Sequence, residues 1–482
     1  MADLRIGYYL RELIKSGPGK AGVVMLGFLL LASIAIVIAF PLDFGSSRWG
    51  NPTIWADNPK SAPPVWSNIF TRTKRPRHVE VDLTEPAESE TTRRATRDLY
   101  RYEFELDSGL APTFISLSLS EIVYEARPPV ISWYLYGPDG REIALERFVV
   151  AGPRSSEDAP YKRYFDDPKR SVVGSDERVI DDLVRFFSAS GHGEIEELEI
   201  SNNLEPALFG VPDGERGYSF LPGSYTIEAQ VLMSGADDTV GSVHIVVGGG
   251  VYGVMGTDAL GRDLALGLLF GLPVALLIGI ATSTVSTILG MSLGMISGYN
   301  GGWIDLSIQR AADIVANIPV LPLLIFLVFI GGSKLWLILL VLVVFSWPGL
   351  TIMVRTMVLQ LRTGVEVEAA RALGARGGRI IIRHIMPHAA SYVLAQLVFF
   401  APSAILAEAG LSFLGLGDPR IPTWGQILEY GFRTGAIFLG YWWWVIPPGV
   451  LIIITAVTFM FLALGLEPVV DPRLRGRRSW HF

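Results

Sequence analysis

The sequence predicts an α-helical membrane protein with six transmembrane helices and a large inserted extracytoplasmic domain that is β-sandwich-like. Half of the 482 residues are hydrophobic and only 18% are charged, whereas charged residues make up about a quarter of a typical soluble domain. Six apolar segments are long enough to form spanning helices. Between the first and the second, residues 43–250 show a hydropathy pattern with a period of two, which is typical of β-strands.

The first apolar segment, residues 21–40, carries no charge. At about 1.5 Å per residue, a helix of this length matches the roughly 30 Å hydrocarbon core of a bilayer. A cleaved signal peptide is the alternative interpretation, but the segment is too long for one and no small-residue cleavage motif follows it. We therefore expect residues 1–42 to form a cytoplasmic N-terminus and the first spanning helix.

Five further apolar segments lie late in the chain, at residues 264–297, 314–333, 335–354, 385–407 and 434–466. The longest is too short for two crossings and a turn, so we expect one helix that is kinked near Pro273. In the last segment, Tyr441, Trp442, Trp443 and Trp444 predict an aromatic belt at the membrane interface. The span itself is then expected at residues 445–464.

Positive charges beside the spans predict the orientation of the chain. They are Arg5, Arg11, Lys15 and Lys20 before the first span, Arg355, Arg362, Arg371, Arg376, Arg379 and Arg383 after the fourth, and Arg473, Arg475, Arg477 and Arg478 after the sixth. Because Lys and Arg concentrate on the cytoplasmic side, we expect a multi-pass protein of the cell membrane with both termini inside. Residues 43–250 and 408–433 then lie outside, residues 251–466 form the transmembrane core, and residues 467–482 form a cytoplasmic tail.

The inserted domain is predicted from alternating strands and turns. In residues 113–120, Ile115, Leu117 and Leu119 alternate with serines and share one face of a strand. Residues 130–136 lead into a turn at residues 137–140. The other predicted elements are a pair of strands at residues 224–233 and 239–247 and one amphipathic helix at residues 176–189, whose apolar stripe is Ile180, Leu183, Val184 and Phe187.

Several functions are excluded by what the sequence lacks. It has no cysteine, which excludes thiol nucleophiles, thiolate zinc sites, iron–sulfur clusters and disulfides. It has no GxxxxGK[ST] loop, so we expect the chain itself to bind no nucleotide. The glycines at residues 298–302 follow no strand and predict a tight turn. No pattern indicates a metal site or a nucleic-acid partner.

The loop at residues 366–388, EVEAARALGARGGRIIIRHIMPH, separates the fourth and fifth spans. Residues 368–373 favour a helix that ends at Gly374, because glycine can adopt a positive φ. A second basic and apolar stretch, residues 379–386, ends at Pro387. The predicted helix, turn and helix would fit a groove on another protein or rest on lipid headgroups, and these residues alone leave both interpretations open.

This loop resembles the EAA loop of permease subunits in binding-protein-dependent ABC importers. The resemblance is carried by the spacing of Glu368, Ala369, Ala370 and Gly374 and by the stretch that ends at Pro387. Residues 404–428, AILAEAGLSFLGLGDPRIPTWGQIL, and residues 256–264, GTDALGRDL, are similar to the second permease subunit of the dipeptide, oligopeptide and nickel branch. The compact members of that family have only a short loop where this chain has its insertion.

The resemblance implies a type I ABC importer permease, a subunit that is not itself an enzyme. It implies a second homologous permease subunit, two ATPase subunits that use ATP and magnesium, and an extracellular substrate-binding protein. The substrate would be a short peptide or an oligosaccharide. The resemblance assigns ATPase coupling to Glu368, Ala369, Ala370, Arg371, Leu373, Gly374 and Pro387. It makes Glu408, Leu411, Phe413, Asp418 and Trp424 candidates for the outer gate or loop.

The few ionisable residues near the spans suggest specific contacts. Asp305, Arg310 and Asp313 are expected at the cytoplasmic end of the third span, where they can pair at i, i+3 and i, i+5 or reach water. For Glu408 a solvated helix end is the simpler interpretation and substrate contact the alternative. For His384 and His388 we favour contact with headgroups over ligand or metal binding.

Two other functions remain open at this point. A membrane-anchored surface receptor or assembly factor would use the β domain to bind a ligand and would have no stable ATPase partner. A secondary transporter should show inverted repeats or buried charges, and the sequence shows neither. The inserted domain could serve as a docking platform for the binding protein, as a gate or as a lid, and a metal chelate is a third class of substrate.

Overall fold

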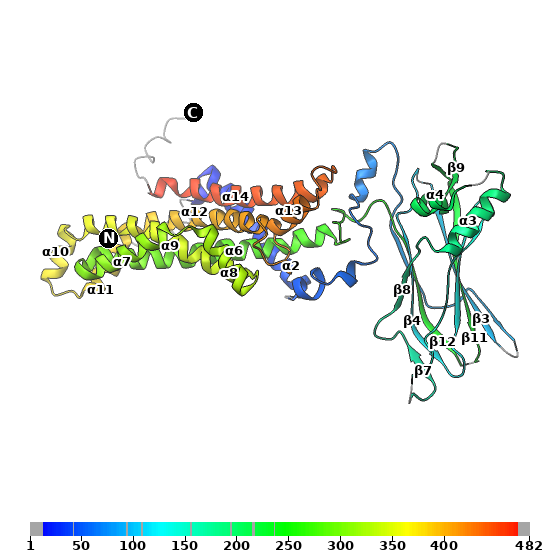
Figure 1. The fold of residues 1–482 in the computed structure, drawn as a ribbon. Helices are drawn as coiled ribbons and strands as arrows, with labels where there is room; N and C mark the ends of the chain where they lie inside the picture. Colours follow the sequence, from blue (N-terminus) through cyan, green and yellow to red (C-terminus); the bar gives the residue numbers. More distant parts are fainter. Residues whose placement is uncertain are drawn as a thin grey trace. The chain divides into compact units, whose positions relative to one another are not determined.

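The computed structural model describes residues 13–41, 43–92, 95–107, 109–154, 157–192, 195–214, 217–235 and 237–470 (Figure 1). The predicted positive charges at Arg5, Arg11, Arg473, Arg475, Arg477 and Arg478 lie outside the described residues. The chain divides into two compact units. Unit 1 is Met1–Pro52 with Leu264–Phe482, and unit 2 is Thr53–Asp263.

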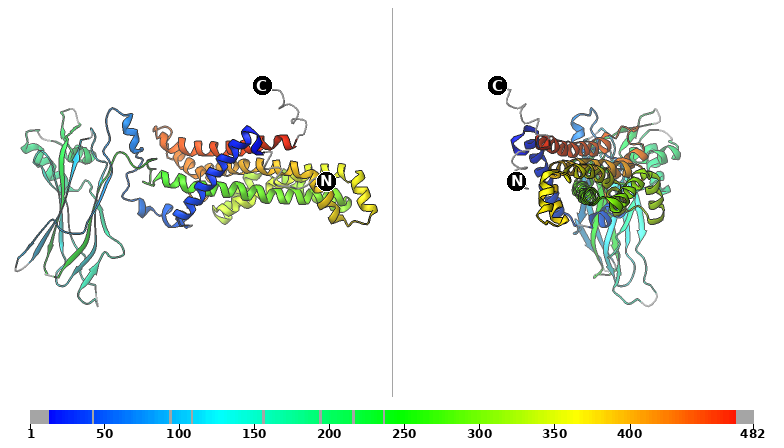
Figure 2. Two further views of the ribbon diagram at one scale, coloured as in Figure 1. Left: turned by 180° about the vertical axis from the view of Figure 1, so that it is seen from behind. Right: turned by 90° about the vertical axis from the view of Figure 1, so that its left-hand side faces the viewer.

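Unit 1 is a bundle of apolar helices. Its long helices are α2 (Gly17–Ala39), α6 (Leu264–Asn300), α9 (Leu335–Leu361), α12 (Met386–Phe413) and α14 (Trp442–Val470). Its shorter helices are α7 (Gly302–Asn317), α8 (Val320–Gly331), α10 (Val365–Ala372), α11 (Gly377–Ile380) and α13 (Trp424–Arg433). Helix α6 packs against α9 and α12, and α14 packs against α12 and α2. Figure 2 shows α10 and α11 at one end of this bundle and α13 at the other.

Glycines on one face of α6 bring it close to α9. A Cβ added at Gly290 would lie 2.9 Å from Leu350 Cβ, and one at Gly294 would lie 2.7 Å from the Thr351 carbonyl oxygen. Because these glycines are four residues apart, they share one helix face. Small residues at this spacing let two membrane helices pack backbone to backbone, so α6 and α9 form the tight centre of the bundle.

The predicted third span is not one straight helix. Five helices in the described residues are long and apolar enough to cross a membrane, and α7 and α8 form a sixth only if they count as one span bent by 80°. Two prolines explain the break: Pro319 is the N-cap of α8 and Pro322 lies in its first turn. Each removes a backbone donor, and Pro319 disfavours helical geometry at Ile318.

The four aromatic residues before the last span differ in exposure: Trp442 is 39% exposed and Tyr441 is half-buried, whereas the other two are buried. Trp443 and Trp444 are 4% and 1% exposed, and the Trp444 indole N–H donates to the Ile427 carbonyl oxygen at 3.0 Å. The predicted belt is contradicted for Trp443 and Trp444 by their burial, and the Trp444 ring packs in the contact between α14 and α13. Helix α14 accordingly begins at Trp442 rather than after the aromatic residues.

Unit 2 contains two five-stranded sheets with a common core. One sheet has the order β1-β12-β4-β7, with β8 also paired to β4, and the other has the order β2-β3-β11-β5-β6. The strands are β1 (Val79–Leu83), β2 (Glu88–Thr91), β3 (Thr96–Leu106), β4 (Ile115–Tyr124), β5 (Val130–Tyr136), β6 (Glu142–Val149), β7 (Tyr161–Arg163), β8 (Lys169–Val172), β11 (Gly223–Met233) and β12 (Thr239–Val247). A small hairpin, β9 (Gly210–Pro212) with β10 (Tyr218–Phe220), and the helices α3 (Glu177–Ala189), α4 (Glu197–Asn202) and α5 (Leu204–Leu208) complete the unit.

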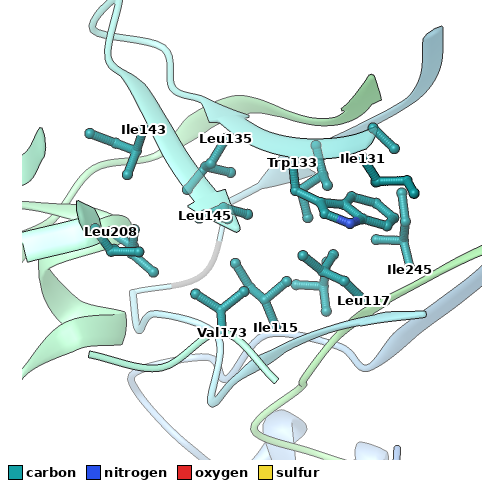
Figure 3. Close-up of a cluster of buried hydrophobic side chains, with 14 of the residues drawn as sticks. Ile115, Leu117, Ile131, Trp133, Leu135, Ile143, Leu145, Val173, Leu208 and Ile245 are labelled. Carbon is teal, nitrogen blue, oxygen red and sulfur yellow. The ribbon is translucent and has the colours of Figure 1, made fainter. Parts of the chain in front are cut away.

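The apolar faces of both sheets meet in one core (Figure 3). Ile115, Leu117 and Leu119 are each 1% exposed, as the alternation in the sequence predicted. The predicted helix is also confirmed, because α3 buries Ile180, Leu183 and Phe187. Ser116 on the opposite face of β4 is buried too. Its hydroxyl is satisfied there, because it donates to Asp57 Oδ1 at 2.8 Å.

The last two long strands do not pair with each other as the sequence suggested. Strand β11 pairs with β3 and β5, whereas β12 pairs with β1 and β4 in the other sheet. The turn between them therefore crosses from sheet to sheet. Asp238 shapes this turn, because its carboxylate accepts hydrogen bonds from the backbone N–H groups of Gly235 and Glu125.

The boundaries of the inserted unit differ from residues 43 and 250 for two reasons. Before Thr53, Phe44 and Trp49 are buried within unit 1, and the Phe44 ring lies 4.8 Å from that of Phe270. After residue 250, the chain pairs with the segment that enters unit 2: Thr257 N–H donates to the Ala62 carbonyl oxygen at 2.8 Å. The entry and exit segments thus hold each other within unit 2.

A buried histidine makes the stability of unit 2 depend on pH. His78 lies between the rings of Phe114 and Tyr252, and its Nδ1 accepts the Gly249 N–H at 3.4 Å. Its Nε2 is buried with no hydrogen-bond partner in the described part of the chain. Burial lowers the pKa of His78 to about 4, although Asp57 partly opposes the shift.

We expect residues 53–263, expressed alone, to unfold cooperatively and to lose stability as the pH falls from about 6.5 towards about 4. In this window the unfolded chain binds a proton at His78 that the folded unit excludes, so acid favours unfolding. Thermal denaturation followed by circular dichroism at several pH values measures the effect.

The control is His78→Phe, which keeps a ring beside Phe114 and Tyr252 but cannot titrate. Above pH 6.5 the histidine is neutral in both states, so its contribution there does not change with pH. The variant should show a smaller loss of melting temperature between the two pH values than the native unit. Equal losses in both proteins would contradict the assignment to His78.

Candidate functional site

The loop between α9 and α12 forms a helix, a sharp turn and a second helix. Helix α10 ends at Ala372, and Gly374 follows with φ +81°. The Gly374 N–H donates to the Arg371 carbonyl oxygen and the Ala375 N–H to that of Ala370, both at 3.0 Å. These two bonds are the Schellman motif, which uses glycine because its left-handed conformation strains other residues. The predicted helix end at Gly374 is confirmed.

One side of α10 is buried and the other is free. Val367 and Ala370 are 3% and 7% exposed, and they pack in a cluster that includes Val358 of α9 and Ala389 of α12. The other predicted coupling residues of α10 and its turn are exposed: Glu368, Ala369, Arg371, Leu373 and Gly374. Helix α10 is therefore fixed to two long helices while it presents a surface outwards.

The free surface of α10 carries two apolar side chains. Val365 is 83% exposed and Leu373 is 88% exposed. The resemblance to the EAA loop assigned Leu373 but not Val365. Val365 could have been found from its position. It is an apolar residue at the start of α10, outside the buried side that Val367 and Ala370 form.

The second stretch of the loop does not end at Pro387. A π-helical turn, Ile381–Ile385, joins α11 to α12, and the Met386 N–H donates to the Ile381 carbonyl oxygen. A proline has no N–H and its ring crowds the carbonyl four residues earlier. The wider π turn removes this conflict, so the helix continues through half-buried Pro387.

The histidines of this region have different surroundings. His388 Nε2 lies 3.5 Å from Glu366 Oε2, which links α12 to α10. His388 is thus close to an acid of the same loop, a contact that the sequence did not indicate. His384 is half-buried.

Asp305 of α7 pairs with a residue of α9, far away in the sequence. Its carboxylate accepts two hydrogen bonds from Arg355 of α9, at 2.5 and 2.6 Å, and one from Ser297 of α6 at 2.5 Å. The predicted i, i+5 pair with Arg310 is therefore wrong, whereas the i, i+3 pair of Arg310 and Asp313 forms at 3.7 Å. Arg355 was counted only as a positive charge beside a span.

A further bond joins the same helices near the loop. Arg362 Nη1 donates to the Gly298 carbonyl oxygen at 3.2 Å. Together with Asp305, it ties α6, α7 and α9 at the end from which α10 begins. The loop therefore extends from a part of the bundle that is held by charged hydrogen bonds.

Most candidates in the outer loop are packed inside the bundle. Glu408 is 3% exposed and accepts a hydrogen bond from Ser412 Oγ at 2.7 Å, so the interpretation as a solvated helix end is wrong. Trp424 is 2% exposed, and its indole N–H donates to the Leu268 carbonyl oxygen at 2.9 Å. Because Trp424 begins α13, this bond fixes α13 to α6.

The remaining outer candidates divide between the core and the surface. Leu411 is buried in a cluster with Leu324 and Ile338. Asp418 is 6% exposed, and its Oδ1 accepts the backbone N–H and the Nε–H of Arg420, both at 3.1 Å. Phe413 is 40% exposed and packs against Phe432. These contacts make residues 413–424 an ordered connection between α12 and α13.

Comparison with known proteins matches the helical unit of the chain. Residues 290–476 match the family described as "Binding-protein-dependent transport system inner membrane component". Over 219 residues, 45% of this chain, it is 34% identical to a putative peptide permease protein of Brucella suis biovar 1 and covers 72% of it. Over 221 residues, 46% of this chain, it is 34% identical to the dipeptide permease DppC and to the oligopeptide permease OppC of Bacillus subtilis, covering 68% and 72% of them.

We expect Asp305→Asn and Arg355→Gln each to lower the free energy of unfolding of the chain in detergent. Because each single change leaves the other member of the pair charged and without its counter-charge, the double variant should lose less than the sum of the two single losses. A coupling energy of roughly 0.5–3 kcal/mol is typical of residues in one such network. Denaturant titration of the four proteins measures it.

Arg310 and Asp313 provide the matched control. Their side chains are 72% and 54% exposed, and exposed pairs contribute about 0–1 kcal/mol. The same cycle on Arg310→Gln and Asp313→Asn should give a smaller coupling energy. Equal values for the two pairs would mean that the contact between α7 and α9 does not stabilise the bundle.

Proposed function

The chain belongs to the family of binding-protein-dependent transport system inner membrane components, and on this basis we propose that it is a permease subunit of an importer of short peptides. It is a non-catalytic membrane component of an ABC transporter. The relatives are named as dipeptide, oligopeptide and glutathione permeases, which favours peptides over oligosaccharides and metal chelates as the substrate. The comparisons give no support to the receptor or assembly factor.

We propose the composition of the complete importer as follows. A second homologous permease forms the translocation pathway with this chain, and two ATPase subunits bind ATP and magnesium. A substrate-binding protein delivers the peptide. This division of work agrees with the absence of a GxxxxGK[ST] loop from the sequence.

The two-sided character of α10 is the observation that carries the proposal for coupling. Val367 and Ala370 hold α10 on the bundle, while Val365 and Leu373 are left for a partner. An apolar side chain that projects from a short helix suits a groove on another protein. The alternative, a helix that rests on lipid, would place no requirement on the sharp turn at Gly374.

The packing of α10 also suggests how a movement is transmitted. Val367 and Ala370 lie in one cluster with Val358 of α9 and Ala389 of α12. Closely packed side chains have little room to deform, so a displacement of α10 shifts both helices together. Closure of the ATPase subunits on ATP would in this way change the access of the pathway from one side of the membrane to the other.

We expect Gly374→Ala to reduce peptide-stimulated ATP hydrolysis in the reconstituted importer by roughly tenfold or more. A Cβ at φ +81° costs about 1–2 kcal/mol, which shifts the turn and the position of Leu373. Leu373→Ser should reduce the rate similarly, since loss of a central contact at an interface commonly costs at least 1 kcal/mol. ATPase assays in vesicles with binding protein and peptide measure both rates.

Gly378→Ala is the matched control for the glycine. A Cβ at Gly378 would meet nothing within 4 Å, and its φ is not positive. It should leave the coupled rate near that of the native importer. Native coupling in Gly374→Ala and Leu373→Ser, with all proteins inserted equally, would remove the coupling assignment and favour the helix that rests on lipid.

We further propose six spans, with α7 and α8 as one bent span, both termini in the cytoplasm and unit 2 outside. The support is the distribution of Lys and Arg beside the spans together with the even number of crossings.

We expect Ser234→Cys, at an exposed position of unit 2, to react with an impermeant thiol reagent in intact cells. Ser479→Cys should react only after the cells are opened. The native chain has no cysteine, so it serves as the unlabelled control. Labelling in the reverse order would overturn the proposed orientation.

A further inference from the structure

Four exposed apolar side chains gather where the chain enters and leaves unit 2. Ile69 and Phe70 are 79% and 80% exposed, Val254 is 65% exposed and Trp66 is 39% exposed. The Trp66 indole N–H donates to the Val254 carbonyl oxygen at 2.8 Å, and the rings of Trp66 and Phe70 lie 6.3 Å apart. We call these four residues the apolar patch. A contiguous exposed patch of this kind marks an interaction surface, unlike single exposed apolar residues.

The patch is built on a loop with a fixed base. Asn68 Nδ2 donates to the Arg75 carbonyl oxygen at 2.9 Å, and Asn68 Oδ1 accepts the Arg75 N–H at 3.1 Å. This pair of bonds closes residues 69–74 into a projecting loop. Ile69 and Phe70 are therefore held at the surface by the structure of the loop, and their exposure does not result from an absence of order.

Positive charges lie on, or directly after, the loop that carries Ile69 and Phe70. Arg72, Lys74 and Arg77 are exposed, and none of them forms an ion pair within 4 Å in the described ranges of the chain. Glu103 and Glu105 of β3, with Asp107 just after this strand, line a cavity of about 920 Å³ together with Trp66, Ile69, Lys74 and Arg77. The loop thus presents aromatic and aliphatic groups next to unpaired cations.

This combination of groups fits the surface of a bilayer. Trp and Phe rings enter the boundary between headgroups and acyl chains, while Lys and Arg attract the phosphates of anionic lipids. The centre of a permanent protein interface is in contrast depleted of charge. The chemistry of the loop therefore favours lipid over a protein as the occupant.

The position of the patch in the chain supports the same occupant. Val254 precedes Leu264, the first residue of α6, by ten positions in the chain, so this connection spans at most about 35 Å. Trp66 is bonded to Val254 and is held within the same reach. The length of this connection therefore sets an upper limit on the distance between the patch and the start of α6.

We propose that the apolar patch and the cations at Arg72, Lys74 and Arg77 form a membrane-seating surface, by which unit 2 rests on the leaflet from which α6 begins. The expected ligands are phospholipids, with anionic headgroups preferred. Such a seat would restrict the orientation of unit 2 without a large protein interface. It would also leave the remaining surface of unit 2 accessible to a partner.

The absence of native cysteine allows a direct test in the full chain. Ile69→Cys and Phe70→Cys are labelled with a nitroxide, and the chain is reconstituted in vesicles of phosphatidylcholine with phosphatidylglycerol. Electron paramagnetic resonance then compares collisions with oxygen, which concentrates in lipid, and with a water-soluble nickel chelate. The control label replaces Leu198, an apolar residue that is 68% exposed and has Glu196, Glu197 and Glu199 as neighbours.

We expect the ratio of oxygen to nickel accessibility at positions 69 and 70 to exceed that at position 198 several-fold. The combined change Arg72→Ser and Lys74→Ser should reduce this ratio, and so should vesicles of phosphatidylcholine alone. A high nickel accessibility at positions 69 and 70 would show that they lie in water and would overturn the proposal. Low accessibility to both probes would show burial against protein and would overturn it equally.

Discussion

The helical unit depends on one constraint: within the hydrocarbon, every backbone N–H and carbonyl group needs a partner inside the protein. Prolines bear directly on this constraint because each lacks the backbone N–H that would donate a hydrogen bond within a helix. Pro273, Pro348 and Pro402 are accommodated inside the continuous helices α6, α9 and α12. Pro387 is accommodated by the π turn that precedes it. Pro447 and Pro448 lie side by side within the continuous helix α14, whereas the segment with Pro319 and Pro322 breaks between α7 and α8 with an 80° bend.

The candidate coupling loop depends on the close contact of α6 and α9. The glycines of α6 bring the two backbones together, and Arg355 then reaches Asp305 while Arg362 reaches the Gly298 carbonyl oxygen. Helix α10 starts directly after this locked end and packs Val367 and Ala370 on it. Small residues, a charged network and a glycine turn thus serve one purpose, which is to hold a short exposed helix rigidly with respect to long helices.

Unit 2 shows how a large insertion can fold within a helical membrane protein. Its entry and exit segments are hydrogen-bonded to each other, so the insertion begins and ends at neighbouring points of the structure. Its core is formed by two sheets and α3, and the sheets are joined by the turn at Asp238. This architecture makes the insertion compact without contributions from the spans.

The features that arise from local patterns could be predicted from the amino-acid sequence alone. Uncharged segments predicted the long helices, and the alternation of apolar and polar residues predicted the buried face of β4. The apolar stripe of α3 followed from its 3.6-residue period, and Gly374 marked the end of α10. These predictions are correct because hydrophobic periodicity and the ability of glycine to adopt a left-handed conformation depend only on residues a few positions apart.

The contacts between residues far apart in the chain depend on how the helices and strands pack in three dimensions. Asp305 pairs with Arg355 rather than Arg310, Trp444 is buried against α13, and β11 and β12 belong to different sheets. The burial of Glu408 likewise follows from the packing around the end of α12. A charged or aromatic side chain has the same local signature whether its partner is solvent, lipid or a distant helix, so its environment is decided when the elements pack together.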